Sequence, residues 1–362
     1  MRRFWRGRGS VTAGITLALA SFTVVAGGPA ASAVTGCSFD AVDTVNVTLD
    51  PNEVAILWVD ELGDIHLTDL VGTTDCGATN AEADTVSVTG DDAGDEYLQI
   101  DESQGGGFSP GLTAEGAGTS EIEINVDLGD GADEVAYVGT SGAEDVEMTA
   151  TGLDLYDDGD TDITVTDVET VDLVGLGGAD VFVANSTPAG VTSKFLFGDG
   201  GGDTLMSGST ADYLDGGDGA DTMNGGTGND IMVGGAGVDD IGGNGGVDTL
   251  ATDTTGTPAT EGLNLDLQTG TVTNDGWGNV DTISAFENVA GTAFGDVIRG
   301  NSAANTFAGG DGNDRLEGRA GADTLSGGAD DDTLNGSYGG DTMLGGTGDD
   351  RIVPGTENDT IT

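Results

Sequence analysis

The sequence is poor in cations. Its 362 residues contain nine Lys and Arg residues against 65 Asp and Glu residues, which gives a formal net charge of −56 at pH 7. Arg2, Arg3, Arg6 and Arg8 stand at the extreme N-terminus, so few cations remain for the rest of the chain. A nucleic-acid-binding protein needs a basic face. We therefore expect no nucleic-acid partner.

Side chains that carry much of enzyme chemistry are scarce as well. The chain has one His (His66), one Lys (Lys194) and two Cys. A zinc site built from Cys and His needs about four such ligands, and most catalytic constellations need several His or a Lys–His pair. The composition therefore predicts a protein that is not an enzyme.

Glycine and acidic residues, by contrast, are abundant. There are 67 Gly residues, and a chain so rich in Gly and negative charge repels itself and stays unfolded unless something neutralises it. A hard cation with oxygen ligands is the candidate that this composition favours.

The N-terminus, residues 1–33, has the three parts of a secretory signal peptide. A basic start is followed by an apolar run of about 16 residues, shorter than the roughly 20 that span a membrane. Ala31-Ser32-Ala33 then forms a small-x-small cleavage site. The alternative is a retained membrane anchor. We expect cleavage, a secreted or extracellular protein, and no transmembrane segment in the mature chain; association with the cell surface is the alternative location.

The two cysteines, Cys37 and Cys76, allow two interpretations. In an exported protein they pair as a disulfide. Val34-Thr35-Gly36-Cys37 also looks like the site at which a bacterial lipoprotein is cleaved and its Cys acylated. The two alternatives exclude each other, and the exported context favours the disulfide.

A nine-residue period dominates the C-terminal half. In Gly216–Asn224 (GGDGADTMN) and the two units after it, the pattern is Gly-Gly-x-Gly-x-Asp-x-apolar-x. Six contiguous units fill 198–251 and eight fill 291–362. The sixth position is Asp in thirteen of the fourteen units, and the eighth position is apolar in all of them. In a low-complexity Gly/Asp linker, no apolar residue would recur at the same position of every unit.

The physical chemistry of one unit follows from its residue types. The Gly-rich part reverses the chain and turns carbonyl groups inward, and the last three residues form a short strand with the apolar side chain facing the interior. Two units make one coil of eighteen residues, and coils must stack to bury their apolar residues. Carbonyl and carboxylate oxygens then meet between stacked turns, in cages that suit Ca²⁺ better than Mg²⁺. Pairing each unit with the second one after it gives at most about ten calcium sites.

These nonapeptides resemble the RTX (repeats-in-toxin, haemolysin-type) calcium-binding repeats. The resemblance implies an all-β fold, a parallel β-roll with Ca²⁺ in its turns. It implies a ligand role for the sixth-position aspartates of regular turns, Asp221, Asp230, Asp239, Asp314, Asp323, Asp332, Asp341 and Asp350. Degenerate turns supply Asp203, Asp212, Asp248, Asp296 and Asp359 as further candidates. Family members that are proteases or lipases carry His-Glu-x-x-His or Gly-x-Ser-x-Gly, and neither motif is present.

The other two regions are less regular. Residues 34–197 contain short β-like runs with faint copies of the turn unit, which predicts either an irregular acidic β-solenoid that leads into the roll or a separate β-sandwich. Residues 252–290 resemble the spacer that separates RTX arrays.

The leading functional hypothesis is a secreted, non-enzymatic protein that binds several Ca²⁺ ions and folds on export. The alternatives are a calcium-stiffened adhesion or matrix protein, or a lipoprotein, at the cell surface. A calcium-dependent polysaccharide lyase is a further alternative, although it needs a base that this chain hardly has. The sequence names no macromolecular partner.

Overall fold

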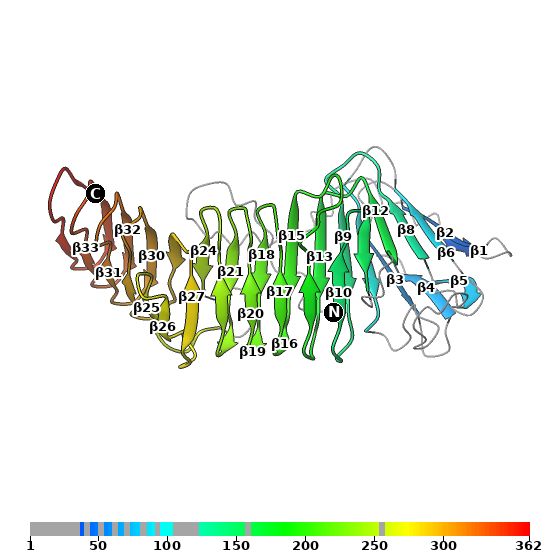
Figure 1. Ribbon diagram of the computed structural model, residues 1–362, viewed down its shortest axis with the longest axis horizontal. Helices are drawn as coiled ribbons and strands as arrows, with labels where there is room; N and C mark the ends of the chain where they lie inside the picture. The colour runs from blue at the N-terminus through cyan, green and yellow to red at the C-terminus, as the bar shows by residue number, and fades with distance from the viewer. Residues whose placement is uncertain are drawn as a thin grey trace.

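The structure is a computed structural model, and it describes residues 37–39, 44–49, 54–59, 64–68, 73–79, 85–90, 95–103, 123–155, 161–252 and 258–362. All regular elements in these ranges are β-strands. The chain winds as an elongated prism with two long sheets along its length (Figure 1). No helix long and apolar enough to cross a membrane occurs in the described part. The predicted signal peptide, 1–33, lies outside the described residues.

The larger sheet, sheet A, has 18 strands. Pairing places them in the order β1 (Cys37–Phe39), β2 (Thr44–Thr48), β6 (Thr85–Thr89), β8 (Glu123–Asp127), β12 (Ile163–Thr166), β11 (Gly152–Asp154), β10 (Asp145–Met148), β14 (Val181–Val183), β17 (Thr204–Met206), β20 (Thr222–Asn224), β23 (Asp240–Gly242), β27 (Asp281–Ser284), β26 (Thr271–Asn274), β25 (Asn264–Asp266), β29 (Val297–Arg299), β31 (Arg315–Glu317), β33 (Thr333–Asn335) and β35 (Arg351–Val353).

The second long sheet, sheet B, has 15 strands. Their order is β5 (Thr73–Thr79), β4 (Asp64–Thr68), β3 (Val54–Val59), β7 (Tyr97–Asp101), β9 (Glu134–Val138), β13 (Thr170–Val174), β15 (Ser193–Phe197), β18 (Tyr213–Asp215), β21 (Ile231–Val233), β24 (Thr249–Ala251), β28 (Asn288–Ala290), β30 (Thr306–Asp311), β32 (Thr324–Ala329), β34 (Thr342–Thr347) and β36 (Thr360–Ile361). A small third sheet within the turns of the first array joins β16 (Gly200–Gly201), β19 (Asp218–Gly219) and β22 (Ala236–Gly237).

Within each nonapeptide array, the strands of both sheets pair in parallel. Consecutive strands of one sheet are shifted by eighteen residues, as in the pairing of Leu205 with Met223 and of Leu214 with Met232. Units therefore feed the two sheets alternately, and two units make one coil. This is the parallel β-roll that the repeat predicted.

The apolar eighth positions form the core of the roll. From Leu205 to Met343, all twelve of these side chains are at most 5% exposed, because each packs between the two sheets and against the coils on either side. Burying each one contributes about 1.5–3 kcal/mol. In the last coil, Ile361 is 52% exposed because a neighbouring coil covers it on one side only.

Sheet A contains two three-stranded insertions with the same topology. In the spacer, β27 pairs in parallel with β23 of the first array, β25 pairs in parallel with β29 of the second, and the antiparallel β26 joins them. The strands β12, β11 and β10 connect β8 to β14 in the same manner. Sheet B has no such insertion at the spacer, because β24 pairs directly with β28 and β28 with β30. Extra strands on one side only lengthen that side, and the prism bends there (Figure 1).

The N-terminal region continues the same winding. β2, β6 and β8 pair in parallel in sheet A, and β3, β7, β9 and β13 do so in sheet B. Parallel stacking in both sheets is solenoid geometry, and a β-sandwich is antiparallel. Antiparallel hairpins at β1–β2 and β3–β4–β5 close this end. Cys37 of β1 and Cys76 of β5 form a disulfide there, with Cα atoms 5.0 Å apart, so the bond joins the two sheets at their first strands.

Candidate calcium sites

The sixth-position aspartates form two inner rows, one for each sheet. In each row the backbone N–H of one aspartate donates a hydrogen bond to Oδ1 of the aspartate eighteen residues later. Such bonds join Asp203 to Asp221 (2.8 Å) and Asp212 to Asp230 (3.0 Å), and they recur through both arrays. One oxygen of each carboxylate is thus held by the previous coil, and the side chain has a fixed direction.

The second oxygen of most of these carboxylates is buried without a hydrogen-bond partner in the described part of the chain. An unpaired buried acceptor costs about 1–3 kcal/mol, and more when it is charged. A cost repeated coil after coil indicates a missing partner of positive charge. The nine predicted ligands with such an Oδ2 are Asp203, Asp221, Asp230, Asp239, Asp248, Asp314, Asp323, Asp332 and Asp341.

The glycines show what surrounds the unpaired oxygen. A Cβ added to the first-position Gly216 would lie 2.5 Å from Oδ2 of Asp221 and 2.6 Å from the carbonyl oxygen of Gly234, which belongs to the next coil. Glycine is required here because oxygens of two coils converge on the space that a side chain would fill. The same convergence recurs at Gly309 and Gly327 of the second array.

Carbonyl groups of the earlier coil face this gap as well. A Cβ at Gly235 would overlap the carbonyl oxygen of Gly217, and one at Gly237 would overlap that of Gly219. The gap between two stacked turns is therefore lined by second- and fourth-position carbonyls of one coil, a first-position carbonyl of the next, and a carboxylate.

Burial gives several of these carboxylates a high pKa. Desolvation raises the pKa of Asp203, Asp230 and Asp314 to about 7, and that of Asp239 to about 8, although the hydrogen bond from the previous coil opposes the shift. Neighbouring aspartates of the same row raise these pKa values further. A divalent cation in the gap would offset both causes, since it supplies the positive charge that the buried carboxylates lack.

This donor set fits Ca²⁺. Calcium accepts six to eight oxygen ligands in loose geometry and takes backbone carbonyls readily. In the described ranges, no three His, Cys, Asp or Glu side chains gather around one point. That is the expected result for a site in which most oxygens belong to the backbone. A metal that prefers nitrogen or sulfur ligands would find none in these gaps.

Comparison with protein families agrees with this geometry. The RTX calcium-binding nonapeptide repeat matches in four copies, at residues 197–232, 215–250, 290–325 and 326–361. These segments are RTX calcium-binding repeats. The matches leave out the N-terminal solenoid and the spacer, and no curated protein matches the chain.

Several RTX turns depart from the common arrangement. Asp296 accepts hydrogen bonds from Thr292 N–H and Thr292 Oγ1 (both 2.8 Å) and from Leu263 N–H (2.6 Å), so its own turn and the spacer together supply donors to both carboxylate oxygens. Asp350 and Asp359, near the end of the roll, accept the bond from the preceding coil and are only partly buried. Asn305 takes an aspartate's place in the sheet B row.

The structure adds two aspartates that the repeat pattern did not select as ligands. Asp180 donates its N–H to Asp203 Oδ1 (2.8 Å) and extends the sheet A row by one coil. Asp281 of the spacer accepts from Asp239 N–H (3.0 Å) across a separation of 42 residues. Because the insertion lengthens the interval between Asp239 and Asp281 to 42 residues, Asp281 does not fall at the eighteen-residue spacing of the repeat.

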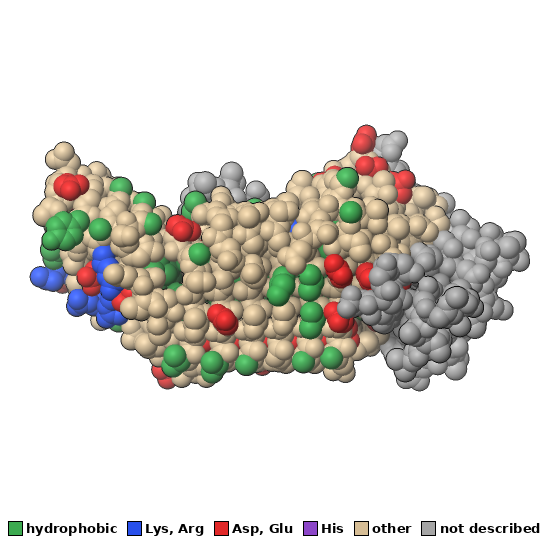
Figure 2. Space-filling model, viewed as in Figure 1, with side chains coloured by type: hydrophobic (Ala, Val, Ile, Leu, Met, Phe, Trp, Pro, Cys, Tyr) green, Lys and Arg blue, Asp and Glu red, His purple; other side chains and the backbone are tan. Residues whose placement is uncertain are grey.

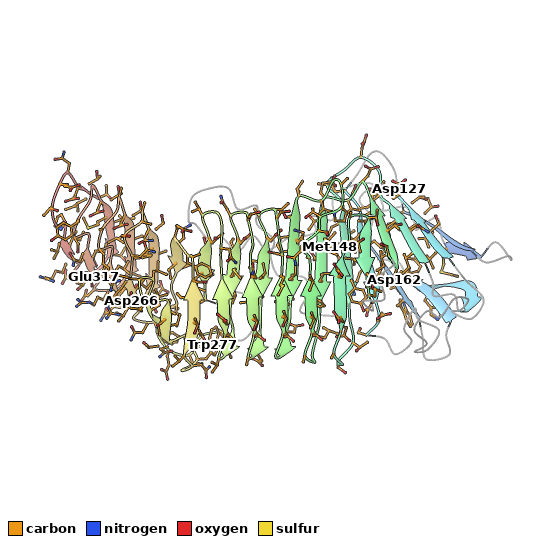
Figure 3. All side chains as sticks on the ribbon, in the orientation of Figure 1. Asp127, Met148, Asp162, Asp266, Trp277 and Glu317 are labelled. Carbon is orange, nitrogen blue, oxygen red and sulfur yellow. A yellow bond between two sulfur atoms is a disulfide. The ribbon has the colours of Figure 1, made fainter. Side chains whose placement is uncertain are left out.

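The cations of the second array lie on its surface. Lys and Arg side chains gather near the C-terminal end of the face shown in Figure 2. Arg319 donates to both carboxylate oxygens of Asp266 (2.8 and 2.6 Å) and to the carbonyl of Gly300 (2.7 Å), and it lowers the pKa of Asp266. Asp266 belongs to the spacer (Figure 3), so this pair fastens the spacer to the second array.

Proposed function

We propose that this chain is a secreted, non-enzymatic protein that binds several calcium ions in the turns of its RTX repeats and folds when it meets calcium outside the cell. The observation that carries the proposal is the double row of buried carboxylates whose second oxygen has no hydrogen-bond partner in the described part of the chain, with carbonyls of two coils lining the gap, as at Gly216.

Charge and burial explain why folding would depend on calcium. The chain carries a net charge of −56, and the rows bring many of its carboxylates into the interior. Without a cation the rows repel themselves and lose their hydration. Calcium bound only by the folded chain would supply folding free energy. About ten gaps are available at most, and extracellular calcium modules typically bind at about 10⁻⁴–10⁻³ M.

Export is supported by the N-terminal pattern and by the cysteines. A disulfide such as Cys37–Cys76 persists in an oxidising compartment. Lys194, one of the few basic residues that a polysaccharide lyase could use beside four arginines, is fully buried and cannot reach a polymer on the surface. That burial supports the non-enzymatic reading.

Calcium titration of the purified mature protein tests the proposal. We expect the circular dichroism signal of β-strands to be weak in excess chelator, to grow cooperatively as calcium is added, and to grow far less with magnesium. A strand signal that is equally strong in chelator and in calcium would refute calcium-dependent folding.

A calcium-stiffened adhesion or matrix protein at the cell surface is the second candidate, and the elongated prism in Figure 1 favours it. This function needs an anchor. Cys37 bonded to Cys76 has no free sulfur for a lipid thioether. The intact mass of the mature protein separates the two cases, because a disulfide removes two hydrogens and an anchor adds a diacylglycerol.

A further inference from the structure

The sheet B row of aspartates begins with a lysine. Lys194 lies on the inner face of β15, and its side chain is fully buried. Its N–H donates to Oδ1 of Asp212 (3.0 Å), as the N–H of Asp212 donates to Oδ1 of Asp230. Lys194 therefore stands where an aspartate would stand one coil before Asp212, with Val171 and Val135 at the same register in the coils before it.

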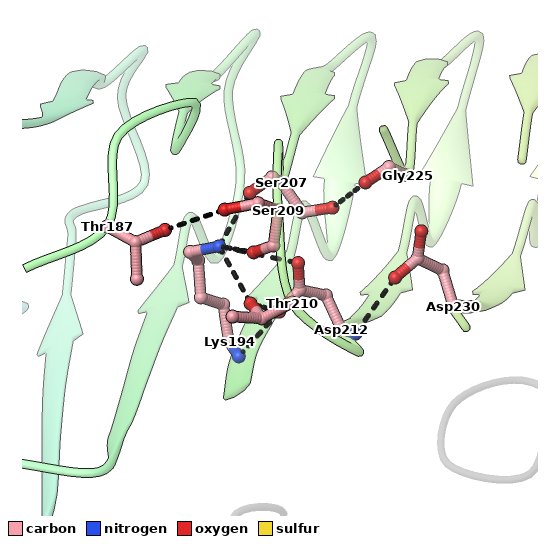
Figure 4. Close-up of polar contacts among 8 residues, drawn as sticks. All are labelled: Thr187, Lys194, Ser207, Ser209, Thr210, Asp212, Gly225 and Asp230. Carbon is pink, nitrogen blue, oxygen red and sulfur yellow. Dashed lines mark hydrogen bonds and ion pairs between the residues drawn. The ribbon is translucent and has the colours of Figure 1, made fainter. Parts of the chain in front are cut away.

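The lysine side chain enters the gap between its own coil and the next. Its Nζ donates to the carbonyls of Ser207 (2.7 Å) and Ser209 (2.5 Å) and to Thr210 Oγ1 (3.0 Å), and it lies 3.4 Å from Asp212 Oδ2 (Figure 4). These oxygens come from the first, third, fourth and sixth positions of one RTX turn. The ammonium thus collects oxygens that the turn directs at its gap.

The contrast with the next coil is clear. Asp230 Oδ2 is buried and accepts no hydrogen bond in the described structure, whereas Asp212 Oδ2 has the lysine ammonium beside it. Two aspartates facing one gap bring two negative charges, which one Ca²⁺ neutralises. A lysine in place of the first aspartate leaves one positive and one negative charge, and the gap is neutral without an ion.

We propose that the Lys194 ammonium takes the place of a calcium ion in the first gap of the sheet B row. This inference rests on the proposed calcium binding by the other gaps. It gives the roll one inter-turn contact that needs no calcium, at the junction where the apolar row of the solenoid gives way to the aspartates of the repeats.

Substitution of Lys194 tests this role. Lys194→Asp restores two carboxylates to the gap and removes the built-in cation. We expect native mass spectrometry at saturating calcium to show one more bound calcium ion per chain than in the wild type. The matched control is Arg315→Asp, which makes the same change of charge at an exposed position of β31 and is expected to leave the number of ions unchanged.

The outcomes are distinct. A folded Lys194→Asp variant with the same number of calcium ions as the wild type overturns the inference. A wild type that binds no calcium refutes the proposed function instead. An added ion in the Arg315→Asp variant would also overturn the inference, because negative charge alone would then explain the gain.

A second variant decides the matter if Lys194→Asp does not fold. Lys194→Met removes the ammonium and adds no carboxylate, so the number of bound ions should stay at the wild-type value. Hydrogen exchange with calcium present should then be faster in Ser193–Phe197 and Tyr213–Asp215 than in the wild type, while β31 and β33 should be unaffected. Unchanged exchange in those two strands would overturn the inference.

Discussion

Replacing Asp230 with asparagine should change stability in opposite directions with and without calcium. Asn keeps the shape of the side chain and still accepts the N–H bond from Asp212 (3.0 Å) through Oδ1. It replaces the unpaired Oδ2 with an amide NH₂, which cannot bind a cation. Asp230 is fully buried and faces two gaps, one shared with the coil of Asp212 and one with the coil of Asp248.

The magnitudes follow from these contacts. A site occupied at about 100 times its Kd contributes about 2.7 kcal/mol, so the loss of two sites removes up to about 5 kcal/mol at saturating calcium. Without calcium, burial raises the pKa of Asp230 from 3.8 to about 7, which makes the charged form cost on the order of 4 kcal/mol near pH 7. Asn avoids that cost and should stabilise the calcium-free fold.

Urea unfolding followed by circular dichroism measures the first effect, and the strand signal in excess chelator measures the second. The control is Asp240→Asn, which removes a charge from an exposed position of β23 and should change stability by less than about 0.5 kcal/mol in either buffer. If Asp230→Asn were equally destabilising in calcium and in chelator, the carboxylate would support the fold independently of calcium and would not be a calcium ligand.

Three other perturbations test the packing and the charge of the roll. Gly216→Ala places a methyl group against oxygens of two coils and should cost roughly 1–3 kcal/mol in urea unfolding. Gly177→Ala, whose Cβ would meet its nearest atom at 3.5 Å, should cost less, and equal costs would contradict the convergence of oxygens. Leu334→Ala removes a fully buried core side chain and should cost about 2–5 kcal/mol, whereas Leu344→Ala, at a side chain 45% exposed, should cost under about 1 kcal/mol. In calcium-free buffer the fold should be most stable below about pH 4 and weaken toward pH 8, because burial raises the pKa of Asp203, Asp230 and Asp314 from 3.8 to about 7, and that of Asp239 to about 8, in the folded chain. Circular dichroism against pH checks this, and a strand signal that grows toward pH 8 would contradict it.

The repeat itself could be read from the sequence because its physics is local. Gly where the chain reverses, Asp at the end of the turn and an apolar residue at the centre of a short strand recur every nine residues, and their roles do not depend on distant segments. The eighth-position residues accordingly form the core, and the aspartate rows have the eighteen-residue register that two units per coil require.

The irregular N-terminal region was less predictable. Its coils differ in length, so no fixed period marks which strands stack, and the sequence left both a solenoid and a sandwich open. In the structure, β3, β7, β9, β13 and β15 lie side by side in parallel at intervals that fall from 43 residues to 23, which is the stacking of a solenoid. The pairing of Cys37 with Cys76 likewise depends on the first strands of both sheets lying at the same end of the prism.

The sequence alone determined that the chain carries RTX turns, that their apolar residues face inward and that their aspartates meet oxygen-rich gaps. Only the tertiary structure decided which residues share a gap. Asp281 joins the row of Asp239 because an inserted hairpin brings it back into register after 42 residues, and Lys194 enters the cage of Asp212 because β15 stacks in phase with β18. The physical reason is that spacing along the chain sets the shape of a turn, whereas strand pairing sets which turns face each other.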